Sequence, residues 1–288
     1  MKKSIERIMN RPAKPGMVGD GFRVFNFIPA IAAQQRMSPF LMLDFNPAYD
    51  FGPSETVKGV DVHPHKGFET VTIAYKGSVA HHDSTGNSGI INPGDVQWMT
   101  AGAGILHKEY HEAAFSKKGG PFEMVQLWVN LPKKFKGEPA HYQAIVASEM
   151  GKIMLPNNGG IVNVIAGKYD ETKGPAKTYS PVNLFDIKLK KDGTANCRVD
   201  ANHNTALLVI SGSIKVNGSP AAEHSFILFS NDGEEINITA SEDAVILLLS
   251  GEPINEPIAS YGPFVMNTKE EIYEAMQEFQ DGKFGVLD

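Results

Sequence analysis

Short runs of alternating apolar and polar residues, divided by turns, dominate the first half of the chain. Residues 69–79 alternate with a period of two, which is typical of a strand with one buried face. Turn signals such as Asn92-Pro93-Gly94-Asp95 separate these runs. Similar stretches that suit β-strands lie at residues 22–28, 40–44, 90–91, 96–100, 105–111 and 123–131. Many short strands separated by turns predict a barrel or sandwich and an all-β fold class.

The second half reads as a degenerate copy of the first. Residues 207–214 repeat the pattern of residues 71–79, including the glycine that closes the run. The length of 288 residues favours two domains, and the turn-rich stretch at residues 155–160 is the best linker. We therefore expect a boundary near residue 150, with one unit at residues 1–150 and another at 151–288.

A short helix is expected near the end of the chain. Thr268-Lys269-Glu270-Glu271 matches a capping box, in which the first and fourth side chains bond to each other's backbone. Ile272, Met276 and Phe279 follow on one helical face, and Gly282 can end the helix. This segment is expected to serve packing rather than chemistry.

Composition and charge exclude several function classes. Apolar residues make up 42% of the chain and charged residues 21%, with 28 glycines and 18 prolines, as in a turn-rich globular protein. The net charge of −6 provides no global positive field for nucleic acid or an anionic membrane, so neither is an expected partner. The single cysteine, Cys197, excludes an intrachain disulfide, and the first residues lack the apolar core of a secretion signal. We expect a cytoplasmic protein.

Two short runs carry the candidate chemistry. His63-Pro64-His65 and His107-Lys108-Glu109 each place two metal-binding side chains two residues apart. On a strand such side chains project from the same face, roughly 7 Å apart, so each run can offer two ligands to one ion. Three imidazoles and a carboxylate suit iron, nickel, copper, zinc or manganese better than calcium or magnesium. Pro64 lacks an amide proton, which predicts an edge strand, a strand start or a bulge for the first run.

Four longer blocks then carry a family resemblance. They read HPHKGFETVT at residues 63–72, NPGDVQWMTAG at 92–102, GILHKE at 104–109 and QLWVNLP at 126–132. These blocks closely resemble the pirin family of the cupin superfamily. The resemblance implies a bicupin fold, with two tandem double-stranded β-helix (jelly-roll) barrels, of which the second has lost its metal. In this chain that loss corresponds to Arg198 and Asp200, which align with His63 and His65.

The same resemblance implies a metal site and an activity. Its ligands would be His63, His65, His107 and Glu109, holding Fe(II), with Zn, Ni, Cu, Mn or Co as other possible ions. Some pirin-like proteins cleave the flavonol quercetin with O2 and release carbon monoxide, so a flavonol or another small aromatic enol and O2 are the expected partners. The alternative is a non-enzymatic, redox-sensitive iron protein that binds transcription-related or other protein partners.

Several nearby residues leave the site open to other interpretations. Glu69 competes with Glu109, because many other cupins use the glutamate after the His-x-His run as a ligand. Either carboxylate, Glu109 or Glu69, is a candidate for the catalytic base. His111 shares the expected face of His107 and is a conceivable but crowded fifth ligand. His81 and His82 are adjacent, so they point to opposite strand faces, and we interpret both as solvated or structural.

Large apolar residues near the runs are interpreted mainly as barrel filling. One or two could also form a wall of the substrate cavity, and Phe68 is nearest in sequence to the ligands. The residues concerned are Phe68, Trp98, Met99 and Trp128. The isolated histidines are interpreted as structural: His141, His203 and His224.

Overall fold

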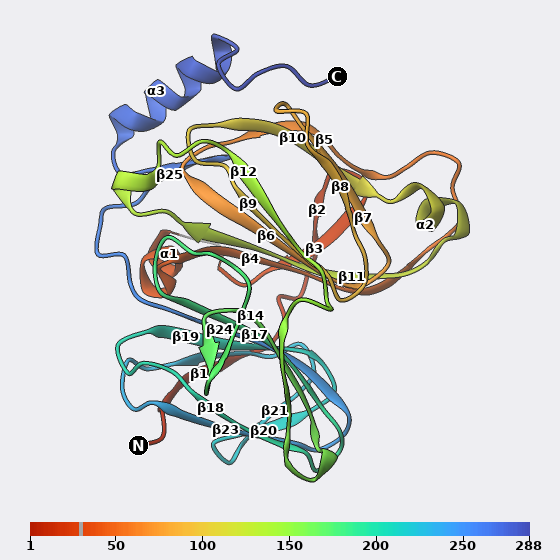
Figure 1. Cartoon of the computed structure of the whole chain (residues 1–288), viewed down its shortest axis with the longest axis vertical. Coiled ribbons are helices and arrows are strands. Elements are labelled where there is room, and N and C mark those ends of the chain that lie inside the picture. The colour runs from red at the N-terminus through yellow and green to blue at the C-terminus, as the bar shows by residue number, and fades with distance from the viewer. Residues whose placement is uncertain (29–30) are drawn as a thin grey trace. The chain divides into compact units, whose positions relative to one another are not determined.

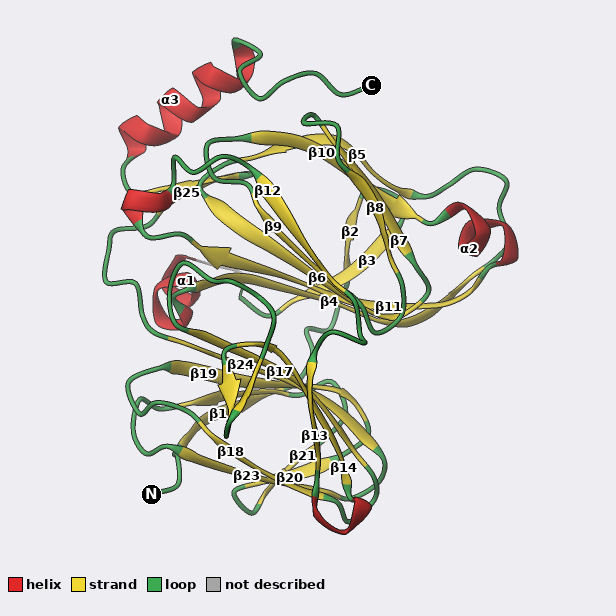
Figure 2. Ribbon diagram, viewed as in Figure 1, coloured by secondary structure: helices red, strands yellow, loops and turns green. Residues whose placement is uncertain are grey.

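Antiparallel β-strands make up most of the computed structural model, which describes residues 1–28 and 31–288 (Figures 1 and 2). The chain divides into two units. Residues 12–147 and 254–288 form one, which we call the histidine unit. Residues 1–11 and 148–253 form the other, which we call the apolar unit. The all-β class expected from the alternating pattern is confirmed.

The histidine unit contains two sheets that face each other across a barrel. The larger has the order β12-β9-β6-β11-β4-β3-β2, and the smaller has the order β5-β10-β7-β8. The larger sheet comprises β2 (Gly16–Val18), β3 (Phe22–Asn26), β4 (Phe40–Phe51), β6 (Phe68–Lys76), β9 (Val96–Thr100), β11 (Gly120–Asn130) and β12 (His141–Ile145). The smaller comprises β5 (Gly59–His65), β7 (Val79–Asp83), β8 (Ser88–Ile91) and β10 (Ile105–His111). Pro64 therefore lies on an edge strand, one of the three positions expected from its missing amide proton.

Helices in this unit are short and lie between or after the strands. They are α1 (Ile31–Met37), α2 (Ala113–Lys118), the 3₁₀ helix η1 (Lys133–Phe135) and α3 (Lys269–Gln280). A two-stranded ribbon, β25 (Ala259–Tyr261) and β26 (Phe264–Met266), precedes α3. None of the helices in residues 1–28 and 31–288 has the length and apolar character needed to traverse a bilayer.

The apolar unit repeats the same topology. Its larger sheet has the order β1-β22-β19-β24-β17-β14-β13 and its smaller sheet β18-β23-β20-β21. The first comprises β1 (Ile5–Met9), β13 (Gly151–Met154), β14 (Gly160–Ala166), β17 (Val182–Leu189), β19 (Asn204–Ser211), β22 (Phe226–Phe229) and β24 (Ala244–Gly251). The second comprises β18 (Thr194–Arg198), β20 (Ile214–Val216), β21 (Ser219–Ala221) and β23 (Glu235–Ala240). The remaining elements are β15 (Lys168–Tyr169), β16 (Thr172–Lys173) and the 3₁₀ helix η2 (Pro156–Asn158).

Side chains fill the interior of the apolar unit. Its buried cluster includes Phe185, Cys197, Val209 and Leu248, each fully shielded from solvent. Burial raises the pKa of the Cys197 thiol to about 12, so this cysteine is an inert packing group. An interior filled by aliphatic and aromatic side chains offers no donor set for a metal.

The chain passes between the units three times rather than once. The boundary expected near residue 150 falls beside the crossing at residues 147 and 148. Residues 1–11, however, group with residues 148–253, and residues 254–288 group with residues 12–147. The grouping of residues 1–11 has a clear cause, because β1 pairs antiparallel with β22 and so extends the larger sheet of the apolar unit. The expected division into residues 1–150 and 151–288 would instead place residues 1–11 with the histidine unit and residues 254–288 with the apolar unit.

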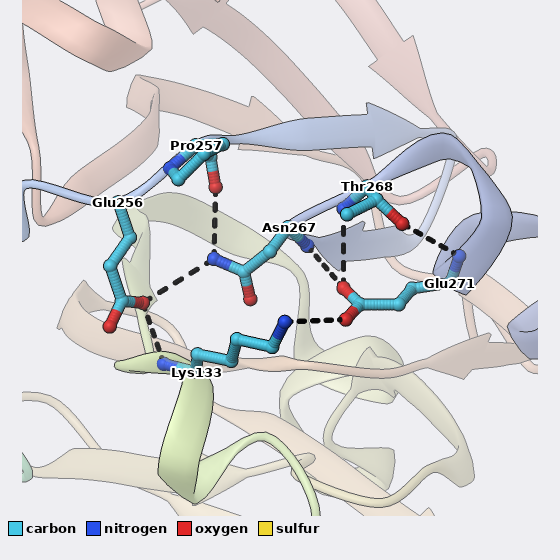
Figure 3. Close-up of polar contacts among 6 residues, drawn as sticks. All are labelled: Lys133, Glu256, Pro257, Asn267, Thr268 and Glu271. Carbon is cyan, nitrogen blue, oxygen red and sulfur yellow. Dashed lines mark hydrogen bonds and ion pairs between the residues drawn. The ribbon is translucent and has the colours of Figure 1, made fainter.

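A polar network ties residues 254–288 to the rest of the histidine unit (Figure 3). Lys133 forms an ion pair with Glu271, with 3.2 Å between Nζ and Oε1. The Glu256 carboxylate accepts from the Lys133 backbone N–H at 2.7 Å and from the Asn267 side-chain amide at 3.3 Å. The same amide of Asn267 donates to the Pro257 carbonyl at 2.9 Å. The segment is thus bonded at two points to Lys133, the first residue of η1.

Helix α3 begins as the sequence predicts. The Thr268 hydroxyl accepts from the Glu271 backbone N–H, and the Glu271 carboxylate accepts from the Thr268 backbone N–H, which completes the capping box (Figure 3). Ile272 and Ala275 are buried against the ribbon of β25 and β26, together with Phe264. Gly282 follows the helix with a φ of +74°, a conformation that favours glycine.

Candidate metal centre

Three histidines converge at one end of the histidine unit. On the ladder between β5 and β10, His107 lies opposite His63 and Ile105 lies opposite His65. One ring nitrogen from each of His63, His65 and His107 lies within 4.8 Å of the others. The spacing of two residues in His63-Pro64-His65 places both imidazoles on the face that His107 shares. These histidines form a metal-binding triad.

The electrostatics of the triad suit a cation. His65 and His107 are buried, and burial holds the pKa of each imidazole well below its ordinary value, with the neighbouring histidines acting in the same direction. The rings are therefore neutral and keep a lone pair for a metal. The His63 Nδ1 lies 2.8 Å from the Asp61 carbonyl, which as an acceptor fixes the proton on Nδ1 and leaves Nε2 free.

Unpartnered buried atoms show directly that the triad fits a metal ion. In the described part of the chain, neither ring nitrogen of His107 has a hydrogen-bond partner, and the Nδ1 of His65 has none. A buried polar atom without a partner costs about 1–3 kcal/mol, and coordination to an ion removes this cost. Neutral imidazoles are suitable ligands for iron, nickel, copper or zinc.

Two aromatic side chains border the triad. The Phe68 and Trp128 rings lie 5.1 and 5.3 Å from the His65 ring, centre to centre, and 4.3 Å from each other. Trp128 and Gln126 are partly exposed although the alternate residues of β11 are buried. Phe68, the nearest of these residues to the ligands in sequence, thus lies beside His65, and so does Trp128. Trp98, by contrast, is fully buried and lies opposite Val71 of β6, on the face of the larger sheet that carries Glu69.

Glu109 lies on the inner face of β10 but outside the group of three imidazoles. Every second residue of β10, from Ile105 to His111, is buried, so Glu109 and His107 face the same way. Its Oε1 accepts from the Thr72 hydroxyl at 3.3 Å and its Oε2 from the Gln126 side-chain amide at 2.9 Å. Burial raises the pKa of the Glu109 carboxyl, and the nearby His63 opposes this effect.

Glu69 occupies the opposite face of the larger sheet. It lies between Phe68 and Thr70 on a regular stretch of β6, whereas Thr72 faces Glu109, so strand alternation directs Glu69 away from the triad. Its Oε1 accepts from the Thr100 hydroxyl at 2.7 Å. Burial raises the pKa of Glu69 to about 7. The side chain is thus a hydrogen-bonded buried carboxyl on the far side of β6.

His81 adds a further imidazole to the inner face. It lies opposite Glu109 on the β7–β10 ladder, is buried, and stacks on the Tyr142 ring with 4.9 Å between ring centres. Burial lowers the pKa of His81 to about 4. Within the described residues its Nδ1 has no hydrogen-bond partner, and His81 and Tyr142 line a cavity of about 140 Å³ together with Gln97. Strand alternation distinguishes His81 from His82, but it does not show which of the two faces inward.

The other histidines lie outside the triad. His82 is exposed and bonds to the Tyr110 hydroxyl on the outer face of β10. The His111 Nε2 donates to the Gly21 carbonyl at 2.9 Å, and the His111 ring packs against Phe122. These contacts give His111 a structural role. His141 bonds to the Pro139 carbonyl, and His203 bonds to the Ser250 hydroxyl. In the apolar unit Arg198, which aligns with His63, is exposed.

Comparison with known proteins identifies relatives over the whole chain. The family model described as Pirin matches residues 21–129, and the model described as Pirin C-terminal cupin domain matches residues 184–285. A protein of Pseudomonas aeruginosa named "Putative quercetin 2,3-dioxygenase" is 45% identical over 267 residues, which covers 93% of each chain. A pirin-like protein of Arabidopsis thaliana is 37% identical and covers 95% of this chain and 83% of its own.

Solved structures give the same result. The crystal structure of a quercetin 2,3-dioxygenase from Acinetobacter baumannii has 46% sequence identity and a TM-score of 0.96, with complete coverage of both chains. A bacterial pirin from Escherichia coli, crystallised in complex with nickel(II), has 22% identity and a TM-score of 0.65, and covers 86% of this chain and all of its own. The latter likeness shows a shared fold.

Proposed function

Because the chain belongs to the pirin family of two-cupin proteins, we propose that it is a metal-dependent dioxygenase that opens the ring of a flavonol such as quercetin with O2 and releases carbon monoxide. The observation that carries this proposal is the group of three buried or partly buried imidazoles, two of them held neutral by burial, with the carboxylate of Glu109 on the same inner face. Relatives at 45% and 46% identity that carry the name of this activity support the choice of reaction.

We propose Fe(II) as the ion, held by His63, His65 and His107, with Glu109 as the fourth ligand that the family pattern implies. When bound, a redox-active divalent ion would supply electron transfer to dioxygen and would favour the anionic form of a coordinated hydroxyl. Zinc has no accessible second oxidation state for this chemistry, whereas nickel, copper, manganese and cobalt remain alternatives.

The role of proton acceptor is assigned to Glu109. The flavonol 3-hydroxyl must lose its proton before the ring opens, and a carboxylate whose pKa is raised by burial is a stronger base than an exposed one. The Glu109 oxygens lie on the inner face together with the triad, whereas Glu69 faces the other side of β6. This geometry favours Glu109 over Glu69 as the base.

Trp128 is proposed as the binding surface for the flat substrate, because it is partly exposed beside His65 and packs on the fully buried Phe68. A flavonol ring can stack on such an aromatic face while its hydroxyl points toward the triad. We propose that the protein acts on a small aromatic enol in the cytoplasm, with no nucleic acid as a partner, since its net charge is −6.

Oxygen uptake tests the proposal. The iron-loaded protein is expected to consume O2 only when quercetin is present, with carbon monoxide as a product. His107→Ala removes a buried ligand and is expected to abolish this uptake, whereas His82→Ala, on the outer face, serves as the matched control. Iron-loaded protein without quercetin-dependent uptake would refute the enzymatic proposal and would favour a non-enzymatic metal protein.

A further inference from the structure

The carboxylate of Glu109 is held by hydrogen bonds at a position apart from the triad. Both of its oxygens are engaged, Oε1 by the Thr72 hydroxyl and Oε2 by the Gln126 amide. The ladder between β5 and β10 has an irregularity here, with one extra residue in β5 between His63 and Val60, whereas β10 itself stays regular against β7. His107 joins the group of nitrogens within 4.8 Å, and Glu109 does not belong to that group.

The two donors are set in place by the larger sheet. Thr72 of β6 lies directly opposite Gln126 of β11, so the pair converges on one carboxylate from adjacent strands. Thr72 is fully buried, and β6 and β11 lie in the interior of the seven-stranded sheet. Donors fixed by ladder bonds lose little freedom when they bind the carboxylate, which makes this position a stable one for Glu109.

A metal ion in the triad would compete with this pair for the same carboxylate. The Glu109 carboxylate lies outside the group of nitrogens, so a shift toward an ion in the triad would lengthen or break the hydrogen bonds that it accepts from Thr72 and Gln126. The affinity of the site for a cation therefore includes the cost of weakening these bonds.

We propose that Thr72 and Gln126 are positioning residues that hold the Glu109 carboxylate in competition with the metal. In this arrangement they weaken the binding of the ion. The inference rests on the proposed ligand set and not on the proposed reaction. Loss of either donor should release Glu109 to the ion.

The test measures cobalt(II) affinity by titration against a competing chelator, in the full-length chain. Gln126→Leu and Thr72→Val remove the donors with little change in volume. Each is expected to bind cobalt(II) more tightly, by about tenfold for Gln126→Leu, which corresponds to about 1.4 kcal/mol. Gln97→Leu is the matched control, because Gln97 lies opposite Thr72 on β9 and is not a donor to Glu109 in the described part of the chain.

The same substitution in a Glu109→Ala protein distinguishes a positioning role of Gln126 from a packing role. In Glu109→Ala protein, Gln126→Leu is expected to leave the cobalt(II) affinity unchanged, because no carboxylate remains to be released. A general packing defect would lower affinity in both backgrounds. The inference is overturned if folded Gln126→Leu and Thr72→Val proteins bind cobalt(II) equally or more weakly, or if the gain persists without Glu109. A lack of quercetin turnover would refute the proposed function and leave this result unaffected.

Discussion

Replacing Lys136 by methionine perturbs a buried amine beside the metal site. The Lys136 side chain is 3% exposed, and its Nζ donates to the Gly67 carbonyl at 2.7 Å, the Asn130 side chain at 2.7 Å and the Val265 carbonyl at 2.9 Å. It thus connects the turn after His65 to β11 and β26. Methionine has a similar length but carries no charge.

The lowered pKa of Lys136 sets the size of the expected change in the free energy of unfolding with pH. Burial lowers this pKa from 10.5 to about 7, although the nearby Glu256 and Glu271 act in the opposite direction. Between these two pH values the unfolded chain binds more protons at Lys136 than the folded chain does, so this residue makes folding more favourable as the pH rises. From pH 7 to pH 9 the gain is about 2 kcal/mol by the linkage relation.

Urea unfolding followed by tryptophan fluorescence measures this effect. Both tryptophans, Trp98 and Trp128, lie in the histidine unit, so the signal reports the unit that contains Lys136. The free energy of unfolding of the wild type minus that of Lys136→Met is expected to rise by about 2 kcal/mol between pH 7 and pH 9. A difference independent of pH would show that the three acceptors keep the amine charged, and it would refute the reasoning.

Three further substitutions test individual contacts. Glu109→Gln is expected to lower kcat for quercetin by about 10²-fold or more, whereas Glu69→Gln, on the other face of β6, should retain activity within about twofold; equal losses in an oxygen-electrode assay would contradict the assignment of the base. A Cβ on Gly89 would lie 2.6 Å from the His81 Nε2, so Gly89→Ala should destabilise the fold by about 1–3 kcal/mol in urea, and unchanged stability would speak against this close contact. Thr268→Ala removes the acceptor of the capping box and should cost about 1 kcal/mol, while Thr268→Ser should restore most of the loss in thermal unfolding.

The sequence predicts the pair His63 and His65 because its geometry is local, since the period of two places both imidazoles on one face. His107 joins them through the pairing of β10 with β5, which the resemblance to pirins implied. The edge position of Pro64 is one of the three that its missing amide proton allowed. The predicted membership of the pirin family, the two cupin barrels and the C-terminal helix are likewise confirmed. These features depend on ordered motifs or on short-range spacing.

Features that depend on distant pairing could not be read in the same way. That β1 adds to β22, and that residues 254–288 return to the histidine unit, follows from contacts between segments far apart in the chain. The inward position of His81 depends on the register of β7 against β10, which alternation alone leaves undetermined. The bonds from Thr72 and Gln126 to Glu109 likewise require the register of β6 and β11.

Metal analysis of the reconstituted protein tests the central claim most directly. After loading with Fe(II) without oxygen and removal of loosely bound ions, elemental mass spectrometry should find one iron per chain in the wild type. His107→Ala, which removes a buried neutral imidazole from the triad, should reduce this occupancy to near zero, and His82→Ala should leave it unchanged. One iron per chain in folded His107→Ala protein, or none in the wild type, would contradict a metal centre built on His63, His65 and His107.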